Sequence, residues 1–438
     1  MTTFKILKLV IRRLGSLKTL KILVIASPVL LVPVSLMVGT MRLSGTITRF
    51  LIHRDTLSSV HVTYDDTWLQ AAHTRSAASG YEELYVGDQP LFEPCNTSLP
   101  PGQPAWGPYK YVGPFEYVKG SKNPCWHSAA GRLSCVPYFY LAGVSKSGTS
   151  DIFQRISHHP DVIVSHKEHH WFDRHRYYSR NLDDNSSFEW YLERFRNVTQ
   201  AIQRDLLTSS FSKKITGDGS PSYFYDSLQW QRYPGNENCT EPRMLLPHHI
   251  RHLYHEARII LSFRHPVSRL YSRFLYDHRK DNSSETFHSW VVDGLAKYLQ
   301  CFRRWSLRHC AYNRSLAQTV QLRINENLYP VLMEDWLRVF PRQQLLLIRF
   351  EDYCRNMSHV LSRIFTFLDL APLNDTEMTK IASTEKIKNK GTGYKSAGLM
   401  LAKTAHILQE FYQPFIRRFA RLVGDDSYLW TDVTISHQ

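Results

Sequence analysis

The sequence predicts an α/β fold in which a central parallel sheet is flanked by helices, carries a phosphate-binding loop and is preceded by a single N-terminal transmembrane helix. Three observations lead to this fold class. Three short apolar runs have the length of buried strands, and a helical pattern follows each of them. A glycine-rich loop follows the first run. An uncharged stretch of membrane-spanning length stands near the N-terminus.

The predicted strands are residues 136–144, 258–263 and 344–350. Apolar residues recur with helical spacing in the segments 149–159, 266–278, 328–340, 358–370 and 398–422. Buried strands that alternate with helices form a parallel sheet covered on both faces. Ligands of such sheets bind beyond the carboxyl ends of the strands, so a functional site is expected in the loops there.

The N-terminal region predicts membrane anchoring. Residues 22–41 carry no charge, and at about 1.5 Å per residue they can span a hydrocarbon core of about 30 Å. Residues 1–21 hold six Lys or Arg and no acid, so they are expected to form a cytoplasmic tail, with the chain after the signal anchor in the lumen. The alternative is a cleaved signal peptide, but the span is long for one and no small-residue cleavage site stands out. We expect a lumenal stem at 42–135 and the α/β domain at 136–438.

The charge favours an anionic partner. Lys and Arg number 54 against 39 Asp and Glu, a formal charge of +15, of which +9 remains without the N-terminal tail. N-x-S/T sequons are more frequent than the roughly two expected by chance, which indicates a glycoprotein of the secretory pathway and argues against a nucleic-acid partner. The sequon asparagines are Asn96, Asn185, Asn197, Asn238, Asn282, Asn313, Asn356 and Asn374.

The seven cysteines all lie beyond the predicted span, where disulfide bonds can form. Two pairs are close enough in sequence to form local bridges, Cys125 with Cys135 and Cys301 with Cys310. The full connectivity stays open, and at least one cysteine is left over. No C-x-x-C spacing occurs, so a zinc site of that kind is unsupported.

The loop after the first strand, Gly143 to Ser150, has the composition of a phosphate-binding loop. Two glycines five positions apart let backbone amides close around a phosphate at a helix N-terminus. The nucleoside-triphosphate loop would have Lys where this sequence has Thr149, and its lysine comes three residues earlier, at Lys146. An early lysine suits a single 5′-phosphate and its leaving group. The alternative is a glycine-rich turn with a solvated lysine.

Two further motifs are weaker when taken alone. Arg264, at the end of the second strand, and Ser272, two helical turns later, could donate to a separate phosphate. Glu168, between Lys167 and His169 and ahead of bulky aromatics, could act as a partly buried general base with a tuned pKa. The alternative for the first motif is a surface Arg and a solvent-facing Ser without a ligand. The alternative for the second is an aromatic anchor in the core, flanked by solvated charges.

Together and in this order, the three motifs resemble the PAPS-dependent carbohydrate sulfotransferases, where PAPS is 3′-phosphoadenosine 5′-phosphosulfate. SKSGTS (145–150) resembles their 5′-phosphosulfate loop, and KEHHWFD (167–173) resembles the catalytic segment of the heparan sulfate 3-O-sulfotransferases. RFEDYCRN (349–356) resembles the family's segment at the end of the sheet, and KNKGTGYKSAG (388–398) resembles its late basic glycine loop over the nucleotide. Within the family, TGDGSPS (216–222) and residues 301–340 are most similar to the N-acetylgalactosamine 4-sulfate 6-O-sulfotransferases.

The resemblance implies a site and a reaction. Lys146 and Glu168 are the expected catalytic residues, and His170 would orient Glu168 or bind the acceptor, with Lys167 and His169 as further acceptor-binding residues. The expected PAPS-binding residues are Lys146, Ser147, Gly148, Thr149, Ser150, Arg264, Ser272, Lys390, Gly391 and Thr392. No metal is expected, because Lys and backbone amides supply the positive charge.

The resemblance also implies a cellular location and an acceptor sugar. Family members are type II proteins of the Golgi membrane with a lumenal catalytic domain, and the acceptor here would be the 6-hydroxyl of GalNAc 4-sulfate in chondroitin or dermatan sulfate. A heparan sulfate O-sulfotransferase is less favoured, because the segment 217–224 lacks the lysine of those enzymes. A non-catalytic glycosaminoglycan-binding protein and a lumenal kinase are competing hypotheses. The residues His248, His249, His252 and His255 could form a metal site, but the sequence favours a solvated basic helix there.

Overall fold

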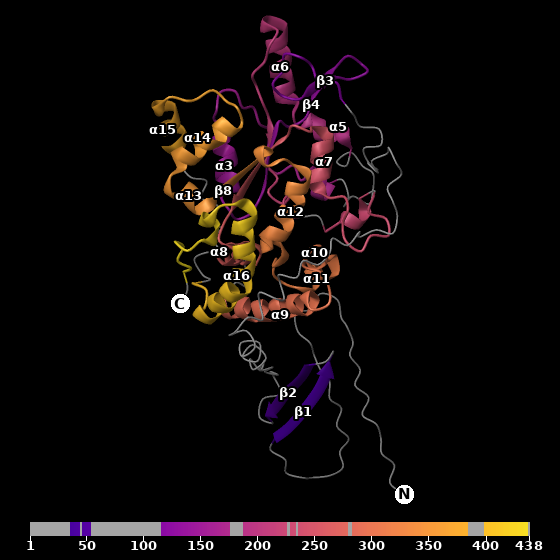
Figure 1. Cartoon of the computed structure of the whole chain (residues 1–438), viewed down its shortest axis with the longest axis vertical. Helices are drawn as coiled ribbons and strands as arrows, with labels where there is room; N and C mark the ends of the chain where they lie inside the picture. The colour runs from indigo at the N-terminus through magenta and orange to yellow at the C-terminus, as the bar shows by residue number, and fades with distance from the viewer. Residues whose placement is uncertain are drawn as a thin grey trace. The chain divides into compact units, whose positions relative to one another are not determined.

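The computed structural model describes residues 36–43, 46–53, 115–175, 187–225, 228–233, 235–278, 283–383 and 398–436 (Figure 1). The chain divides into two units, Met1–Gly80 and Tyr81–Gln438. In the first unit, β1 (Leu36–Leu43) pairs antiparallel with β2 (Thr46–His53). Of the predicted transmembrane segment, residues 22–35 lie outside the described residues and 36–41 belong to β1. Within the described ranges, no helix has the length and apolarity needed to cross a bilayer.

The second unit is built on a four-stranded sheet with the order β6-β5-β7-β8. All three pairings are parallel. The strands are β5 (Phe139–Gly143), β6 (Gly217–Asp218), β7 (Arg258–Phe263) and β8 (Leu345–Arg349). Every residue of β5 is buried, as its unbroken apolar run predicts. The three predicted strands and the parallel sheet are confirmed, and the two-residue strand β6 is an addition that the sequence did not indicate.

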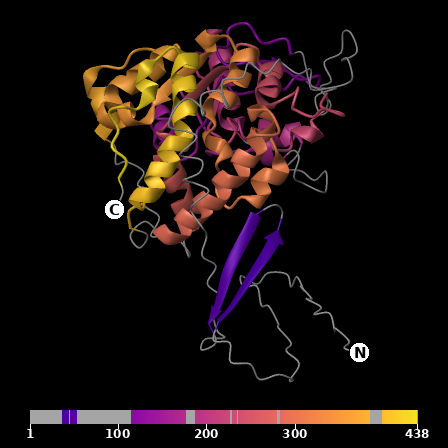
Figure 2. The ribbon, with the colours of Figure 1, turned by 60° about the horizontal axis from the view of Figure 1, so that its bottom comes forward.

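The helices gather in two groups beside this sheet. One group comprises α3 (Thr149–Ile156), α13 (Phe350–Arg355), α14 (Met357–Phe367) and α15 (Asp375–Ser383), in which α14 contacts the other three. The other comprises α7 (Leu246–Leu253), α8 (Pro266–Asp277), α12 (Tyr329–Val339) and α16 (Ala402–Val423). Figure 1 shows α3, α14 and α15 on the left of the sheet and α7 and α12 on the right. Figure 2 shows α16, in yellow, as a long helix, and it contacts both α8 and α12.

The five predicted helices correspond to α3, α8, α12, α14 and α16. Proline is favoured in the first turn of a helix, where a backbone N–H would have no partner within the helix. Pro266 begins α8, and Pro330 is the second residue of α12. The other α-helices in the described residues are α5 (Phe188–Glu193), α6 (Arg196–Ser209), α9 (Ser284–Phe302), α10 (Leu307–Ala311) and α11 (Arg314–Thr319).

One prediction about α7 is wrong. The four histidines around it suggested a solvated basic helix, but α7 buries its apolar face and His249 together. Burial also lowers the pKa of His248 to about 4. In the part of the chain that the structure describes, no group of three or more His, Cys, Asp or Glu is placed to hold a metal ion.

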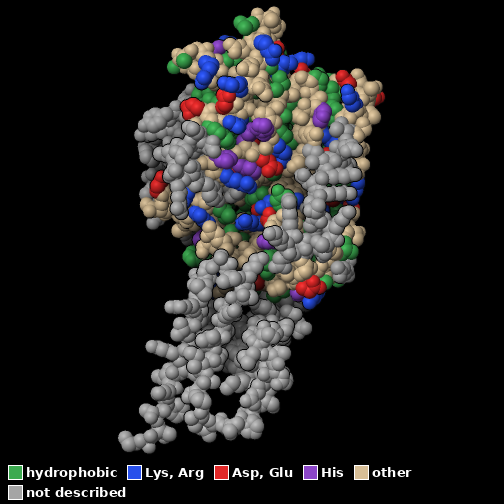
Figure 3. All heavy atoms as spheres, turned by 180° about the vertical axis from the view of Figure 1, so that it is seen from behind, with side chains coloured by type: hydrophobic (Ala, Val, Ile, Leu, Met, Phe, Trp, Pro, Cys, Tyr) green, Lys and Arg blue, Asp and Glu red, His purple; other side chains and the backbone are tan. Residues whose placement is uncertain are grey.

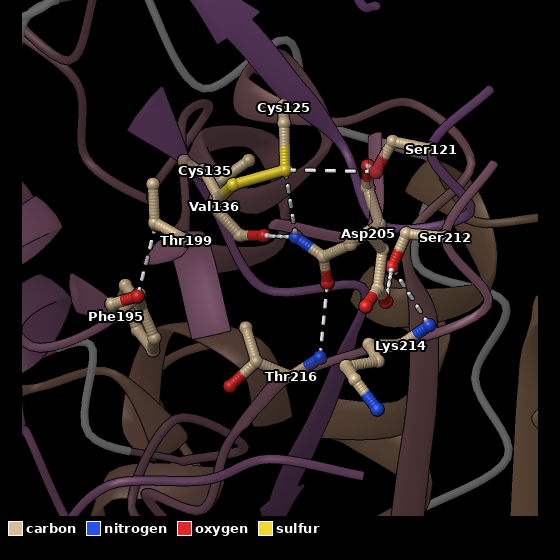
Figure 4. The surroundings of a disulfide bond; sticks show 11 residues. Ser121, Cys125, Cys135, Val136, Phe195, Thr199, Asp205, Ser212, Lys214 and Thr216 are labelled. Carbon is tan, nitrogen blue, oxygen red and sulfur yellow. Dashed lines mark hydrogen bonds between the residues drawn. A yellow bond between two sulfur atoms is a disulfide. The ribbon is translucent and has the colours of Figure 1, made fainter. Parts of the chain in front are cut away.

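Both predicted local disulfides are present. Cys125–Cys135 joins β3 (Cys125–His127) to β4 (Leu133–Cys135), and Cys301–Cys310 joins α9 to α10. Figure 4 shows the first bridge beside Val136 and Thr216, at the start of the sheet. Asn123 donates to the Val136 carbonyl (2.9 Å) and accepts from the Thr216 amide (2.9 Å). The hairpin is therefore tied to the segments that lead into β5 and β6.

We expect the paired change Cys125→Ser and Cys135→Ser to lower the free energy of unfolding by about 2–4 kcal/mol, because the open hairpin gains conformational freedom in the unfolded chain. Urea denaturation measures this loss. The matched control is Cys354→Ser, at an exposed thiol, which should leave stability nearly unchanged. Equal stability of the paired variant and the control would contradict a stabilising role for the bridge.

Candidate active site

Loops from all four strands meet at the carboxyl edge of the sheet, as expected for parallel strands. The Val144 amide donates to the Ser262 carbonyl of β7 (2.9 Å), and the Ser262 hydroxyl donates to the Ser147 carbonyl (2.8 Å). These bonds attach the loop after β5 to the neighbouring strand. The site residues are therefore held by hydrogen bonds to the sheet.

The loop from Val144 to Gly148 leads into α3 with a backbone shaped for an anion. Gly148 has a φ of +74°, and a Cβ added there would lie 2.6 Å from the Phe350 ring. Gly148 is the N-cap of α3 and provides no side-chain cap, so the first amides of the helix are available to a ligand. Thr149 is buried and Ser150 is half-buried at the start of this helix. The predicted strand, glycine loop and helix are confirmed as a unit.

Lys146 stands at the tip of this loop. It has a φ of +71°, which is uncommon for a residue with a side chain. Its Nζ lies 4.2 Å from the ring centroid of Tyr276 on α8, a cation–π contact. The Arg264 guanidinium donates to the Lys146 carbonyl (3.3 Å) and lies 5.2 Å from the Phe350 ring centroid. The structure therefore brings Lys146 and Arg264 together.

A buried arginine anchors the base of the loop, and no sequence motif pointed to it. Arg269 on α8 is fully buried and donates to the carbonyl (2.8 Å) and hydroxyl (2.9 Å) of Ser145. It also donates to Asn327 (2.7 Å) and pairs with the buried Glu326 carboxylate. Tyr225 completes the cluster by donating to the Ser145 hydroxyl (2.9 Å). The position of Lys146 therefore depends on a buried cluster to which α8, residues 326–327 and Tyr225 contribute.

Replacement of Arg269 by Ala is expected to destabilise the protein by about 3–5 kcal/mol, because the Glu326 carboxylate would stay buried without its partner. Chemical denaturation of both proteins measures the difference. Arg196→Ala is the matched control, since Arg196 pairs with Glu193 at the surface, where an ion pair contributes about 0–1 kcal/mol. Similar effects of the two changes would contradict the anchoring role.

A cavity of about 440 Å³ opens beside Arg264. Ser268, Glu351, Arg355 and Asp432 are among its lining residues. The Asp432 carboxylate pairs with Arg355 (2.6 Å) and with Arg349. Ser272 lies one turn further along α8, is half-buried and is not part of this lining. Ser268 lines the cavity instead, so it is better placed than Ser272 to donate to a phosphate there. Lys390, Gly391 and Thr392 lie outside the described residues.

The second predicted cluster surrounds Glu168. Its carboxylate forms an ion pair with the neighbouring Lys167 and lies 3.4 Å from His170 Nε2. The hydrogen bond from His170, followed by the charge of Lys167, lowers the pKa of Glu168 to about 2 despite partial burial. Burial opposes protonation of His170, but hydrogen bonds to Asp173 and Glu168 raise its pKa to about 9. At neutral pH the pair is therefore a carboxylate held by an imidazolium.

Two residues without a predicted role complete this cluster. Asp173 Oδ2 lies 3.3 Å from His170 Nδ1, and the Ser222 hydroxyl contacts both side chains (2.9 Å to His170). The His170 amide donates to Ser220 (3.0 Å), which in turn donates to the buried Asp218 (2.7 Å). The segment from Asp218 to Tyr225 thus touches both the Glu168 cluster and the base of the Lys146 loop.

The structure separates His169 from this group. Its ring is buried, packs edge-on against Tyr191 and Phe195, and has Nε2 3.3 Å from the Ser165 hydroxyl. Burial lowers its pKa. In this structure His169 is a core residue, whereas Lys167 and His170 lie at Glu168.

The raised pKa of His170 predicts a pH-dependent contribution to stability. Its contribution is complete below the unfolded value of about 6.5 and is lost as the pH rises through about 9. The difference in free energy of unfolding between the wild type and His170→Gln should therefore shrink by about 2–3 kcal/mol over this range. Denaturation at several pH values measures it, with His127→Gln as an exposed control. A difference that stays constant from about pH 6 to about pH 10 would contradict the imidazolium assignment.

The surface carries the charge that the composition predicts. Figure 3 shows Lys, Arg and His side chains gathered across the middle of one face, with few acidic side chains among them. The formal charge of the whole chain is +15. Such a face favours an anionic macromolecule.

Comparison with known proteins identifies the family of this chain. The family described as Sulfotransferase domain matches residues 137–417. Carbohydrate sulfotransferase 15 of Mus musculus is 34% identical over 310 residues, which are 68% of this chain and 55% of that protein. The Homo sapiens protein of that name is 33% identical over 69% of this chain and 56% of its own length. The chain therefore spans a little over half the length of these relatives.

More distant proteins are also similar. Heparan sulfate glucosamine 3-O-sulfotransferase 6 of Homo sapiens is 24% identical over 66% of this chain and 72% of that protein. Among solved structures, a sulfotransferase from Alicyclobacillus acidocaldarius is 22% identical with a TM-score of 0.40, over 67% of this chain and 99% of that one. Since the family match covers more than half of the sequence, the chain belongs to the sulfotransferase domain family.

Proposed function

We propose that this protein transfers a sulfuryl group from PAPS to a sugar hydroxyl of a glycosaminoglycan. The acceptor we favour is the 6-hydroxyl of GalNAc 4-sulfate in chondroitin or dermatan sulfate. The observation that carries the proposal is the segment from Asp218 to Tyr225, which contacts both the Glu168 cluster and the Lys146 loop. A base and a cation for the leaving group are thereby held at one edge of the sheet.

The residues of the loop suit a nucleotide phosphate. The uncapped start of α3 and the left-handed Gly148 offer backbone N–H groups, and Thr149 and Ser150 add hydroxyls. We assign the 5′-phosphosulfate to Lys146, Ser147, Gly148, Thr149 and Ser150. We assign the 3′-phosphate to Arg264 with Ser268 and Ser272, next to the cavity of about 440 Å³. Lys390, Gly391 and Thr392 are proposed to cover the nucleotide.

In the proposed reaction, Glu168 accepts the proton of the attacking hydroxyl. Its low pKa keeps it ionised throughout the neutral range, but a carboxylate with so low a pKa is a weaker base than the tuned one that the sequence suggested, so positioning must supply more of its effect. His170, held by Asp173 and Ser222, orients the Glu168 carboxylate through its Nε2. Lys146 neutralises the charge that develops on the oxygen between sulfur and the departing 5′-phosphate. Positioning and electrostatics supply the catalysis, as they do in phosphoryl transfer.

We also propose that the protein is a single-pass type II protein of the Golgi membrane with its catalytic domain in the lumen. The uncharged stretch 22–41, the basic tail before it and the excess of sequons support this address. Immunofluorescence with antibodies to each end of the chain, before and after selective permeabilisation of the plasma membrane, tests the topology. A lumenal N-terminus would contradict it.

The experiment that tests the function is sulfate transfer by the purified full-length chain. PAPS carrying radiolabelled sulfate is offered with chondroitin 4-sulfate, unsulfated chondroitin or heparan sulfate, and the products are resolved as disaccharides. We expect a disaccharide sulfated at both the 4- and 6-positions of GalNAc. Label only in heparan sulfate would overturn the acceptor assignment, and the absence of transfer to every glycan would overturn the proposed function.

A further inference from the structure

Cationic and aromatic side chains lie beside the proposed base. Residues Trp171 to His175 form a single π-helical turn. Its first three side chains are buried, and Arg174 is the first of the turn to be exposed. The Arg174 Nε lies 3.9 Å from Asp173 Oδ2, the same oxygen that contacts His170. One carboxylate therefore separates Arg174 from the His170–Glu168 pair.

Helix α5 supplies the other half of this surface. The Trp190 ring centroid lies 4.5 Å from the Arg194 guanidinium carbon and 5.1 Å from the centroid of the His175 ring. Burial lowers the pKa of His175, and the charges of His170, Arg174 and Arg194 lower it further. We refer to Arg174, His175, Trp190 and Arg194 as the Arg174 cluster.

Arg194 retains hydrogen-bonding capacity. Its buried Nε finds no acceptor within the described part of the chain. The carboxylate one residue before it, that of Glu193, pairs with Arg196 instead (2.9 Å). A buried guanidinium donor without an acceptor is costly unless a ligand or water fills the position. An anion at this place would provide the missing acceptor.

The geometry of the favoured acceptor indicates which anion this is. In GalNAc 4-sulfate, the sulfate ester on C4 and the hydroxyl on C6 lie on the same side of the ring and are separated only by C5. When the 6-hydroxyl faces Glu168, the 4-sulfate must therefore lie next to Glu168. Guanidinium groups bind such oxyanions through paired N–H donors, and the indole offers an apolar face to the sugar ring.

We infer that Arg174 and Arg194 bind the sulfate already present on the acceptor sugar and so select GalNAc 4-sulfate over unsulfated GalNAc. This inference rests on the proposed function and adds specificity residues to it. The segment from Gly217 to Phe224, which touches the Glu168 cluster, contains no Lys or Arg and cannot bind the sulfate by charge. A Cβ at Gly219 would lie 2.7 Å from the Phe153 ring, so this position has no room for a side chain without rearrangement. The Arg174 cluster supplies a cationic surface from a different part of the chain.

The test compares two acceptors that differ only in the sulfate. Binding of fluorescent chondroitin 4-sulfate and unsulfated chondroitin oligosaccharides is measured on the full-length protein with PAP present. Arg174→Ala and Arg194→Ala should each weaken binding of the 4-sulfated oligosaccharide by about tenfold, because each removes a charge-assisted contact. Binding of the unsulfated oligosaccharide should change by less than about twofold. The matched control, Arg196→Ala on the neighbouring helix, should alter neither.

Further readouts separate the possible outcomes. Arg174→Lys and Arg194→Lys keep the charge but lose the paired donors, and should recover only part of the selectivity. The PAP-induced shift in melting temperature should be the same in all variants, which shows that each is folded and binds nucleotide. Equal weakening of both oligosaccharides, or no weakening, overturns the inference. If the wild type makes no GalNAc product disulfated at positions 4 and 6, the proposed function fails instead, and the two failures are thereby distinguished.

Discussion

Replacing Lys146 by alanine is expected to lower kcat for sulfate transfer by about 10²–10³-fold, the usual cost of removing one preorganised donor to a developing negative charge. The loop that carries Lys146 is fixed by Ser262 and by the buried Arg269, so the backbone at Lys146 is already held in place before the nucleotide binds. The affinity for PAP should change much less, because the backbone amides at the start of α3 remain. Transfer of radiolabelled sulfate and calorimetric titration with PAP measure the two quantities.

The control for this change is Lys119→Ala, an exposed lysine before the hairpin of β3 and β4. It changes the net charge by the same amount as Lys146→Ala and should keep the activity of the wild type. If both variants retained activity within about threefold of the wild type, Lys146 would have no part in stabilising the leaving group.

Glu168→Gln should reduce kcat by about 10²–10⁴-fold, because the amide keeps the shape of the side chain but cannot accept a proton. Hydrogen bonding by His170 gives Glu168 a pKa of about 2, so the wild-type base is ionised at every pH above about 3. The acid side of the pH–rate profile should therefore show no loss of activity near the ordinary glutamate pKa of about 4.3. Initial rates at saturating PAPS across this range measure both effects.

The control for Glu168→Gln is Glu116→Gln, at an exposed position. It should leave the rate unchanged, and the PAP-induced rise in melting temperature should be the same in both variants as in the wild type, which shows that each is folded and binds nucleotide. A pH–rate profile with an inflection near the ordinary glutamate pKa, or unchanged activity in Glu168→Gln, would contradict the assignment of the base.

The sheet could be predicted because its strands are continuous apolar runs. β5, β7 and β8 are buried on both faces, so their sequences carry no polar alternation and stand out from the rest. β6 could not be predicted, because only Gly217 and Asp218 pair with β5. A Cβ at Gly217 would lie 2.3 Å from the Phe139 ring, and nothing in the sequence reveals so close an approach.

The same distinction holds for the site. The residues of the Lys146 loop are neighbours in sequence, and so are Glu168 and His170. Each group could therefore be named from a short motif. The contact of Ser222 with His170 joins residues 52 positions apart and depends on the chain order through the sheet. The burial of Arg269 depends on Glu326, 57 residues later. Arg269 lies between Arg264 and Ser272, so its place in the motif was visible while its role was not.

The position of the bound nucleotide decides whether Lys146 and Arg264 have the roles proposed for them, and a crystal structure of the protein with PAP establishes that position. We expect the 5′-phosphate to lie on the amides at the start of α3, and the 3′-phosphate to lie at Arg264. We also expect Lys146 Nζ to leave the ring of Tyr276 and bond a 5′-phosphate oxygen. PAP bound away from this edge of the sheet, or a Lys146 side chain that does not touch the nucleotide, would refute both assignments.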